Sequence, residues 1–342
     1  MSNNLILSLR DLLSTNTYIA AALVAASTAL CGVFSYHCYL SFPFAGEVPI
    51  CWSWVPILGD AIEFGKQPIE FMLNKSRKVK QEIIGVLLAG ERIFLINDPD
   101  SYSTIFKVDK TKFSFDVFAN QVTCNVFGVP ESVCKHANDM NTEAEARAGY
   151  QKYLLHDSGC DDITARMLDK MHSMSEELVI NLFRTDGGAS AQGAPVVNLL
   201  TFINDFVYRA SVAALFNSEI ADDKAVFDSF MSFDSVFALA VTGMPVYNER
   251  LSSYFGTTYA ADRERVVDCI MRVVDKSGPF IAHRSDMYSK IDISNRDIAR
   301  YQLAMVWAGT GNTMPGSQSC IELYVWTLQL YFHILCVCLC YV

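Results

Sequence analysis

Several kinds of site that a sequence can announce are missing from this chain. The six histidines show no His-Glu-x-x-His motif and no paired Cys and His spacing, so we predict no metal site built from side chains. No Gly-x-Ser-x-Gly element is present, which leaves an α/β-hydrolase unsupported. Basic runs are absent and the net charge is −10, which argues against nucleic acid as a partner.

The eleven cysteines lack the regular spacing of a secreted disulfide framework. Cys31 and Cys38 lie in one apolar run, and Cys336, Cys338 and Cys340 alternate in another. Reduced, buried thiols are the better interpretation of this pattern, and they fit a reducing compartment.

Charge is absent between Asp11 and Glu47. Residues 18–40 are apolar and long enough to cross a bilayer of about 30 Å as a helix. A cleaved signal peptide would have a shorter apolar core and a basic start, whereas here only Arg10 precedes the run, beside Asp11. We therefore predict a short N-terminal segment, 1–16, and an uncleaved transmembrane anchor, 17–40.

Basic residues follow this span, and by the positive-inside rule they place the bulk of the chain in the cytosol. They are Lys66, Lys75, Arg77, Lys78 and Lys80. Prolines and glycines are concentrated in residues 41–59, which we expect to form a stiff hinge.

After the hinge, the pattern of apolar residues predicts one mostly helical domain over residues 60–316, with a small early β-sheet. A hairpin is expected at 83–96, with its turn at residues 89–92, and a helix is expected to start at Asp98-Pro99. The Phe-rich region around 113–127 reads as looser. Further helices are expected at 161–183, from Asn198, at 227–247, at 259–274 and from Ser294.

The last of these helices carries Trp-Ala-Gly-Thr-Gly-Asn-Thr-Met-Pro-Gly at residues 307–316. A glycine-rich phosphate loop is excluded, because no strand precedes it and Met314 stands where a glycine would be needed. Glycine and proline are costly inside a helix. The stretch is therefore either the end of the helix or a kinked helix whose break faces a cofactor cavity.

Four stretches together resemble the cytochrome P450 family, in particular its sterol 7α-hydroxylase, sterol 12α-hydroxylase and prostacyclin synthase clan. Residues 52–71 resemble the hinge and first helix, and residues 86–102 resemble the first sheet and the helix after it. Residues 113–128 resemble the variable loop over the haem, and residues 307–315 resemble the central, oxygen-binding helix. The resemblance implies the N-terminal two-thirds of a P450 fold behind a transmembrane anchor.

The resemblance also implies roles for particular residues. The family pattern Ala/Gly-Gly-x-Asp/Glu-Thr starts at Ala308, so Gly311 takes the place of the acid and Asn312 that of the threonine. An asparagine at that position is typical of the 7α-hydroxylase and prostacyclin synthase group. The expected catalytic residues are Asn312 and Thr313; those beside haem are Ala308, Gly309 and Gly311; those for substrate are Phe115, Phe118 and Phe127. The segment 233–247 is a further expectation for the substrate channel. These three phenylalanines and this segment could equally supply ordinary core aromatics.

Departures from the family limit what the chain is expected to do. No cysteine lies in a Phe-x-x-Gly-x-x-x-Cys loop, which would supply the thiolate ligand of haem iron, and a Glu-x-x-Arg pair is also missing. Residues 317–342 stop resembling the family and read as an aberrant hydrophobic tail or as a second transmembrane helix. We therefore expect the chain, as a truncated form, to be inactive.

The implied function is a haem-thiolate monooxygenase or isomerase of a sterol or oxidised lipid. Its expected location is the endoplasmic reticulum membrane, with the domain facing the cytosol and a P450 reductase as partner. The alternative is a non-catalytic helical membrane-associated protein with an apolar anchor at each end.

Overall fold

The structure is a computed structural model, and it describes residues 2–108, 112–137, 140–184, 198–242, 258–311, 313–314 and 317. The chain divides into two compact units. The first unit comprises Met1–Ser114 and Ala238–Met244, and the second comprises Phe115–Phe237 and Pro245–Val342. Each unit is described by itself.

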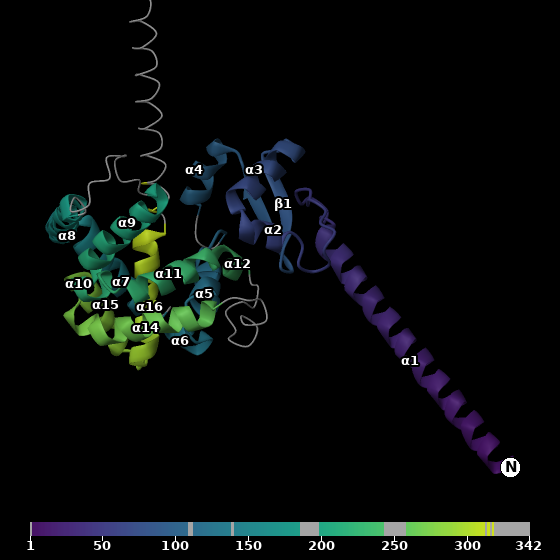
Figure 1. Cartoon of the computed structure of the whole chain (residues 1–342). Helices are drawn as coiled ribbons and strands as arrows, with labels where there is room; N and C mark the ends of the chain where they lie inside the picture. Colours follow the sequence, from purple (N-terminus) through teal and green to yellow (C-terminus); the bar gives the residue numbers. More distant parts are fainter. Residues whose placement is uncertain are drawn as a thin grey trace, which may run out of the picture. The chain divides into compact units, whose positions relative to one another are not determined.

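The first unit begins with the long helix α1, Ser2–Ser41, drawn in purple in Figure 1. Among the described residues, the segment Tyr18–Ser41 is the one stretch of helix that is long and apolar enough to cross a membrane. None of the 18-residue apolar window within it is buried. This criterion rests on length and composition, and it agrees with the predicted anchor.

The hinge after α1 is held by side chains rather than by its prolines alone. The His37 ring Nε2 is 2.8 Å from the Ser53 carbonyl oxygen. The Arg92 guanidinium donates to the carbonyl oxygens of Tyr39, Leu40 and Phe42. Since helix C-termini leave carbonyls unpaired, Arg92 satisfies the end of α1.

Two helices and a hairpin complete the core of the first unit. Helix α2 covers Ala61–Lys66, and α3 covers Pro68–Val79 with Pro68 in its first turn, as predicted. Strand β1, Ile83–Leu88, pairs antiparallel with β2, Glu91–Ile96. The turn is shorter than predicted, because Ala89 and Gly90 both adopt positive φ, at 51° and 89°, and so close a two-residue hairpin.

Helix α4, Pro99–Lys107, starts where predicted, and Asp98 caps it by accepting from the backbone N–H groups of Asp100 and Ser101. The second unit then opens with a helix in the region that was expected to be looser: α5, Asp116–Asn125. It has no strong apolar stripe, which is why periodicity alone did not find it. Helix α6, Glu131–Ala137, follows.

The next helices form a continuous stretch. Helix α7, Met140–Tyr150, passes into the π-helix η1, Gln151–Leu155, and α8 follows over Asp157–Arg184. Helix α9, Leu199–Leu215, is capped by Asn198, as predicted. The short α10, Ser218–Ala221, leads to α11, Lys224–Ser235.

The predicted helix at 227–247 is wrong as a single element, because α11 ends at Ser235 and a new short helix, α12, covers Phe237–Val241. The predicted helix at 259–274 is confirmed as α14, Tyr259–Val273. A 3₁₀ turn, η4, Val274–Lys276, and an unpredicted helix, α15, Pro279–Ser289, precede α16. Helix α16 covers Asn295–Thr310.

Helix α16 lies at the centre of the second unit, where it packs against α9, α14 and α15 (Figure 1). The core around these helices contains large buried rings, among them Tyr208, Phe230, Phe233 and Tyr259. The Tyr259 hydroxyl donates to the Val126 carbonyl oxygen at 3.0 Å, so a ring that would otherwise bury a polar group is satisfied. The helical class with one small sheet is therefore as predicted.

Candidate functional site

The candidate site lies at the C-terminal end of α16, and the start of that helix fixes its register. Ser294 caps the helix: its Oγ accepts from the Asp297 backbone N–H at 3.2 Å and donates to the Asp297 carboxylate at 2.6 Å. The predicted start is confirmed, with aspartate in the place of the usual glutamate or glutamine of a capping box.

The helical hydrogen bonding continues through the first part of the glycine-rich stretch. The Thr310 hydroxyl donates to the Val306 carbonyl oxygen at 2.7 Å, and the Gly311 N–H donates to the Trp307 carbonyl oxygen at 2.7 Å. Gly311 itself keeps helical dihedrals, φ −60° and ψ −30°. The glycines therefore do not interrupt the helix before residue 311.

The structure places the predicted residues of this stretch in different surroundings. Thr313 is exposed, and its hydroxyl donates to the Gly309 carbonyl oxygen at 3.1 Å. Ala308 is also exposed. Asn312 lies outside the described residues, as do residues 315 and 316, so the predicted kink at the proline is not described.

The two glycines face different neighbours. A Cβ at Gly309 would lie 3.1 Å from the Leu215 Cδ1 of α9, so this face of α16 is packed against another helix. A Cβ at Gly311 would lie 3.0 Å from the Trp307 ring. Both glycines therefore allow a close approach of neighbouring side chains.

An aromatic cluster surrounds Trp307, and we call Phe127, Phe233, Phe237 and Trp307 the Trp307 cluster. The Trp307 ring stacks on Phe237 with centroids 4.0 Å apart and planes at 12°. Phe127 joins both rings, with its centroid 6.4 Å from Trp307 and 6.2 Å from Phe237. Phe127 also lies 6.1 Å from Phe233.

One acid is attached to this cluster. The Trp307 indole Nε1 donates to the Asp234 carboxylate at 2.9 Å. Burial raises the pKa of Asp234, and the hydrogen bond from Trp307 opposes that rise. Asp234 falls in the segment 233–247 that was expected at the substrate channel, of which residues 243–247 lie outside the described residues. Trp307 was not named as a site residue, although it is the first residue of the glycine-rich motif.

The three phenylalanines predicted for substrate do not gather at one place. The ring centroids of Phe115 and Phe118 are 5.5 Å apart, and both side chains are exposed. Phe127, by contrast, is buried in the Trp307 cluster. Of the three, only Phe127 is next to α16 by these contacts.

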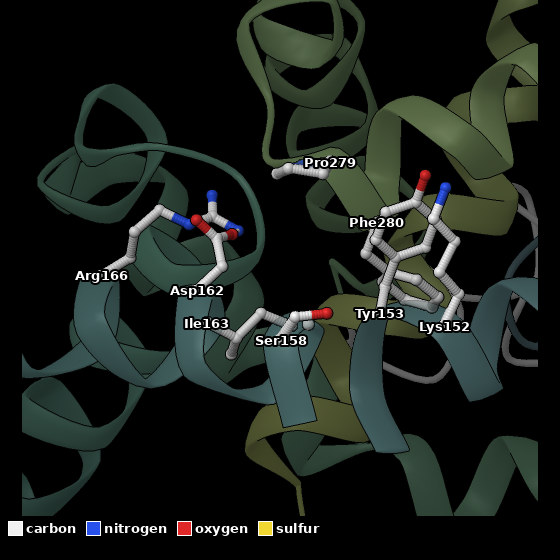
Figure 2. Close-up of a pocket in the computed structure, with 9 residues that line it drawn as sticks. Lys152, Tyr153, Ser158, Asp162, Ile163, Arg166, Pro279 and Phe280 are labelled. Carbon is white, nitrogen blue, oxygen red and sulfur yellow. The ribbon is translucent and has the colours of Figure 1, made fainter. Parts of the chain in front are cut away.

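A separate cavity of ≈ 190 Å³ lies between η1, α8 and the start of α15 (Figure 2). Lys152 and Tyr153 line one side, and Asp162 and Arg166 line the other. The Arg166 and Asp162 side chains form an ion pair at 3.2 Å, so these two charges offset one another, and Lys152 adds a second cation to the lining. None of the predicted site residues lines it.

The residues that the structure describes do not fit a haem group. Haem-thiolate chemistry requires a cysteine thiolate as the iron ligand. The described cysteines are all free thiols, and none has the Phe-x-x-Gly-x-x-x-Cys loop of the family around it. The Trp-x-x-x-Arg pattern that would help to hold haem propionates is not present around Arg147, which is exposed and paired with Glu143 at 2.8 Å. The Gly309 face that would approach the group is covered by Leu215.

Comparison with known proteins gives relatives of one kind. Cytochrome P450 7B1 of Mus musculus is 23% identical over 281 residues, covering 79% of this chain and 50% of that protein. Cholesterol 7-alpha-monooxygenase of Cricetulus griseus is 26% identical over 292 residues, covering 80% and 53%. Prostacyclin synthase of Homo sapiens is 24% identical over 177 residues, covering 51% and 31%. The chain resembles the cytochrome P450s.

A solved structure gives the same fold. The retinoic acid bound cyanobacterial CYP120A1 matches with a TM-score of 0.53 and 15% identity, covering 81% of this chain and 60% of that one. No family model matches the chain. The chain spans about half the length of the curated P450 relatives named first. The P450-like fold and the predicted resemblance are confirmed, whereas activity and substrate remain matters for proposal.

Proposed function

We propose that the chain supplies the substrate-side part of a membrane-anchored monooxygenase or isomerase acting on a sterol or an oxidised lipid. The observation that carries this proposal is the similarity to sterol and prostacyclin P450s over about 80% of the chain. The proposal makes α16 the helix that faces the reacting group, with Ala308, Gly309 and Gly311 beside the haem once the Leu215 side chain, which now covers Gly309, has moved aside. Asn312 and Thr313 are proposed to donate hydrogen bonds to dioxygen or to an oxygen atom of the substrate.

The Trp307 cluster is the proposed wall of the substrate channel. Flat, apolar rings such as those of a sterol pack well against stacked aromatic side chains, which offer large contact area at little entropic cost. Asp234 provides one acceptor at the edge of this wall, at 2.9 Å from the Trp307 indole. Phe115 and Phe118 are exposed, and we propose that they meet lipid at the mouth of the channel.

The proposed setting is the endoplasmic reticulum membrane, with α1 as the anchor, the part of the chain from the hinge to residue 316 in the cytosol and a P450 reductase as partner. A C-terminal tag tests the membrane arrangement in sealed microsomes. A protease that removes the tag while α1 stays bound supports a single anchor. A protected tag supports the alternative, a non-catalytic protein held by an anchor at each end, since residues 323–342 carry no charge.

Haem is the cofactor implied by the family, and the chemistry it supplies when bound is oxygen or peroxide activation at iron. We propose that these 342 residues alone do not hold it in the thiolate form, because no cysteine has the required loop. The reduced, carbon-monoxide difference spectrum of the purified chain is expected to lack a thiolate band. A strong band would overturn this point.

Sequencing the transcript beyond the codon for Gly316 tests whether the tail replaces a haem loop.

A photoreactive sterol tests the proposed channel independently of haem. The full chain in microsomes is irradiated with a diazirine sterol, with or without excess cholesterol, and its tryptic peptides are mapped. Competed labelling is expected on the peptide 113–135, which holds Phe127, or on the peptide that begins at Tyr301 and holds Trp307. Labelling that is confined to α1 and is not competed would overturn the proposal.

A further inference from the structure

Two thiols from different helices lie in direct contact in the second unit. The Cys124 Sγ of α5 is 2.8 Å from the Cys134 Sγ of α6. Both cysteines are free. Nine residues, 125–133, lie between the two cysteines, so a bond between their sulfurs would close a short loop across the α5–α6 corner. The entropic cost of closing a loop is smaller for a short loop than for a long one.

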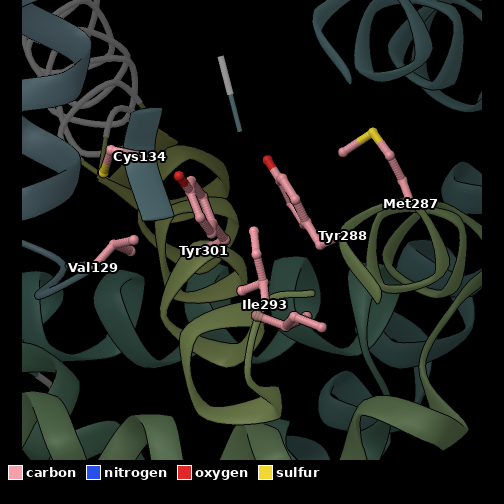
Figure 3. Packing of buried hydrophobic residues seen from close by; sticks show 7 residues of the cluster. Val129, Cys134, Met287, Tyr288, Ile293 and Tyr301 are labelled. Carbon is pink, nitrogen blue, oxygen red and sulfur yellow. The ribbon is translucent and has the colours of Figure 1, made fainter. Parts of the chain in front are cut away.

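Cys134 belongs to a buried cluster that reaches α16. Its side chain is 3% exposed and packs with Tyr288, Ile293 and Tyr301 (Figure 3). The Tyr288 and Tyr301 rings stack with centroids 4.5 Å apart. Tyr301 and Cys134 belong to the same buried cluster, so the thiol pair lies beside a residue of α16.

A cavity beside the thiol pair gives small solutes a route to the more exposed sulfur. A cavity of ≈ 370 Å³ is lined by both cysteines and by polar side chains of α5 and α6. Cys124 is half-buried and Cys134 is buried, so Cys124 is the more accessible of the two. At the rim of this cavity Lys135 pairs with Glu131 at 2.9 Å.

We propose that Cys124 and Cys134 form a reversible oxidation site, in which a hydroperoxide converts the two thiols into an intramolecular disulfide. The inference stands apart from the proposed function, since it depends on neither haem nor substrate. In a reducing compartment such a bond is transient, and thiols restore the open pair.

The steps balance with one peroxide. With hydrogen peroxide, the Cys124 thiol first loses its proton and its sulfur attacks one peroxide oxygen; the O–O bond breaks, the sulfenic acid of Cys124 forms, and the hydroxide that leaves takes up the lost proton and becomes one water. The Cys134 sulfur then attacks the sulfenic sulfur; the S–S bond forms, the S–O bond breaks, and the hydroxyl leaves as a second water with the Cys134 proton. Two thiols are oxidised by two electrons and the peroxide is reduced by two.

The surroundings set the rate of the first step. Burial, followed by the hydrogen bond and charge of Cys134, raises the pKa of Cys124 to about 12; Glu131 adds to the rise and Lys135 opposes it. The thiolate that attacks is therefore scarce at neutral pH. Oxidation is expected to be slow there and to speed up as the pH rises.

The sequence offers a clean readout, because trypsin cuts after Lys112 and Lys135 and leaves both cysteines, with no other, in one peptide. The full chain in detergent is treated with hydrogen peroxide, quenched in acid, and alkylated with iodoacetamide in urea. We expect both iodoacetamide labels to be lost together from peptide 113–135. Dithiothreitol should then restore both sites for a second alkylating label. The tryptic peptide 153–166, with the single exposed Cys160, is the internal control.

The variant Cys124→Ser separates a pair from two independent thiols. In this variant Cys134 should keep its iodoacetamide label after peroxide, since it is buried and has no partner sulfur. The proposal is overturned if the wild-type peptide keeps both labels at a peroxide dose that oxidises Cys160. It is also overturned if the labels are lost singly, or if the bond joins two chains. Because the wild-type result decides by itself, a poorly folded variant leaves the test intact.

Discussion

Trp307 and Asp234 are joined by a hydrogen bond of 2.9 Å although they are far apart in the chain, and the same Trp307 ring stacks on Phe237 at 4.0 Å. The bond ties α16 to α11 at the point where the helix approaches its glycine-rich end. Through this bond, the Asp234 carboxylate is a polar group in contact with the otherwise aromatic Trp307 cluster.

Removing the indole donor tests what this bond contributes. Trp307→Phe keeps an aromatic ring for Phe237 but leaves the half-buried Asp234 carboxylate without its donor. A buried acceptor left unsatisfied costs about 1–3 kcal/mol, so the urea midpoint of the full chain in detergent should fall. The double variant with Asp234→Ala, which removes the acceptor as well, should lose less than the sum of the two single changes. Additive losses would mean that the two residues do not interact.

The acid itself predicts a pH dependence. The folded pKa of Asp234 is raised above its ordinary value of 3.8. The native state therefore holds the proton more tightly, and the free energy of unfolding falls as the pH rises from that value through the folded pKa. Asp234→Asn keeps an acceptor for Trp307 and removes this loss. The stability of the variant relative to wild type should grow over that pH range, and a gap that shrinks would contradict the assignment.

Patterns of neighbouring residues predicted much of the secondary structure. Contacts between residues that are far apart in the sequence could not be predicted from them. The caps Asp98, Asn198 and Ser294 act on backbone groups within three residues, so the sequence pattern located them correctly. The contact of Trp307 with Asp234 depends instead on how α11 packs beside α16. No periodicity records that arrangement, because it is fixed by the tertiary fold.

The candidate site was predicted in part for the same reason. Helical spacing correctly made residues 307–311 part of one helix, but it could not tell which face is covered. The structure shows Leu215 against Gly309, and this contact comes from α9. The three phenylalanines were predicted from the resemblance of residues 113–128 to the loop over the haem, whereas exposed Phe115 and Phe118 lie at the start of α5 and buried Phe127 lies beyond its end.

The two glycines of α16 should respond differently to alanine. A Cβ at Gly311 would lie 3.0 Å from the Trp307 ring, so Gly311→Ala should displace the indole, change its fluorescence and lower the urea midpoint. Gly309→Ala is the matched control: its Cβ meets the end of the flexible Leu215 side chain, and alanine favours the helix by about 1 kcal/mol. Equal effects of the two variants would argue against the described packing of Trp307.

Glu264 of α14 connects two arginines of α16, at 2.8 Å to Arg296 and 3.0 Å to Arg300. Burial alone would raise the pKa of Glu264, but hydrogen bonds from Arg300 and Arg296 hold it below 4.5. Its contribution to stability is therefore present above that value and is lost as the pH falls through the folded pKa.

Glu264→Gln should accordingly destabilise the chain at pH 7 by about 1–3 kcal/mol, because charge-assisted bonds to both arginines are weakened. The difference from wild type should shrink when the same urea titration is run below pH 4.5. Arg265→Gln serves as a control, since Arg265 is on the same helix but pairs with Asp262. A loss that is independent of pH would show that packing, and not charge, is responsible.

Arg92 should hold the hinge against the end of α1. Its guanidinium donates to three carbonyl oxygens and pairs with Glu47 at 2.9 Å, and it also lies over the Phe44 ring at 4.1 Å. Arg92→Ala removes all of these contacts, so chymotrypsin should cut microsomal protein faster at the hinge aromatics, such as Trp52 and Trp54. Glu47→Gln should change the rate far less, because the carbonyl contacts remain. If both variants were cut at the wild-type rate, the hinge would be held by its prolines rather than by Arg92.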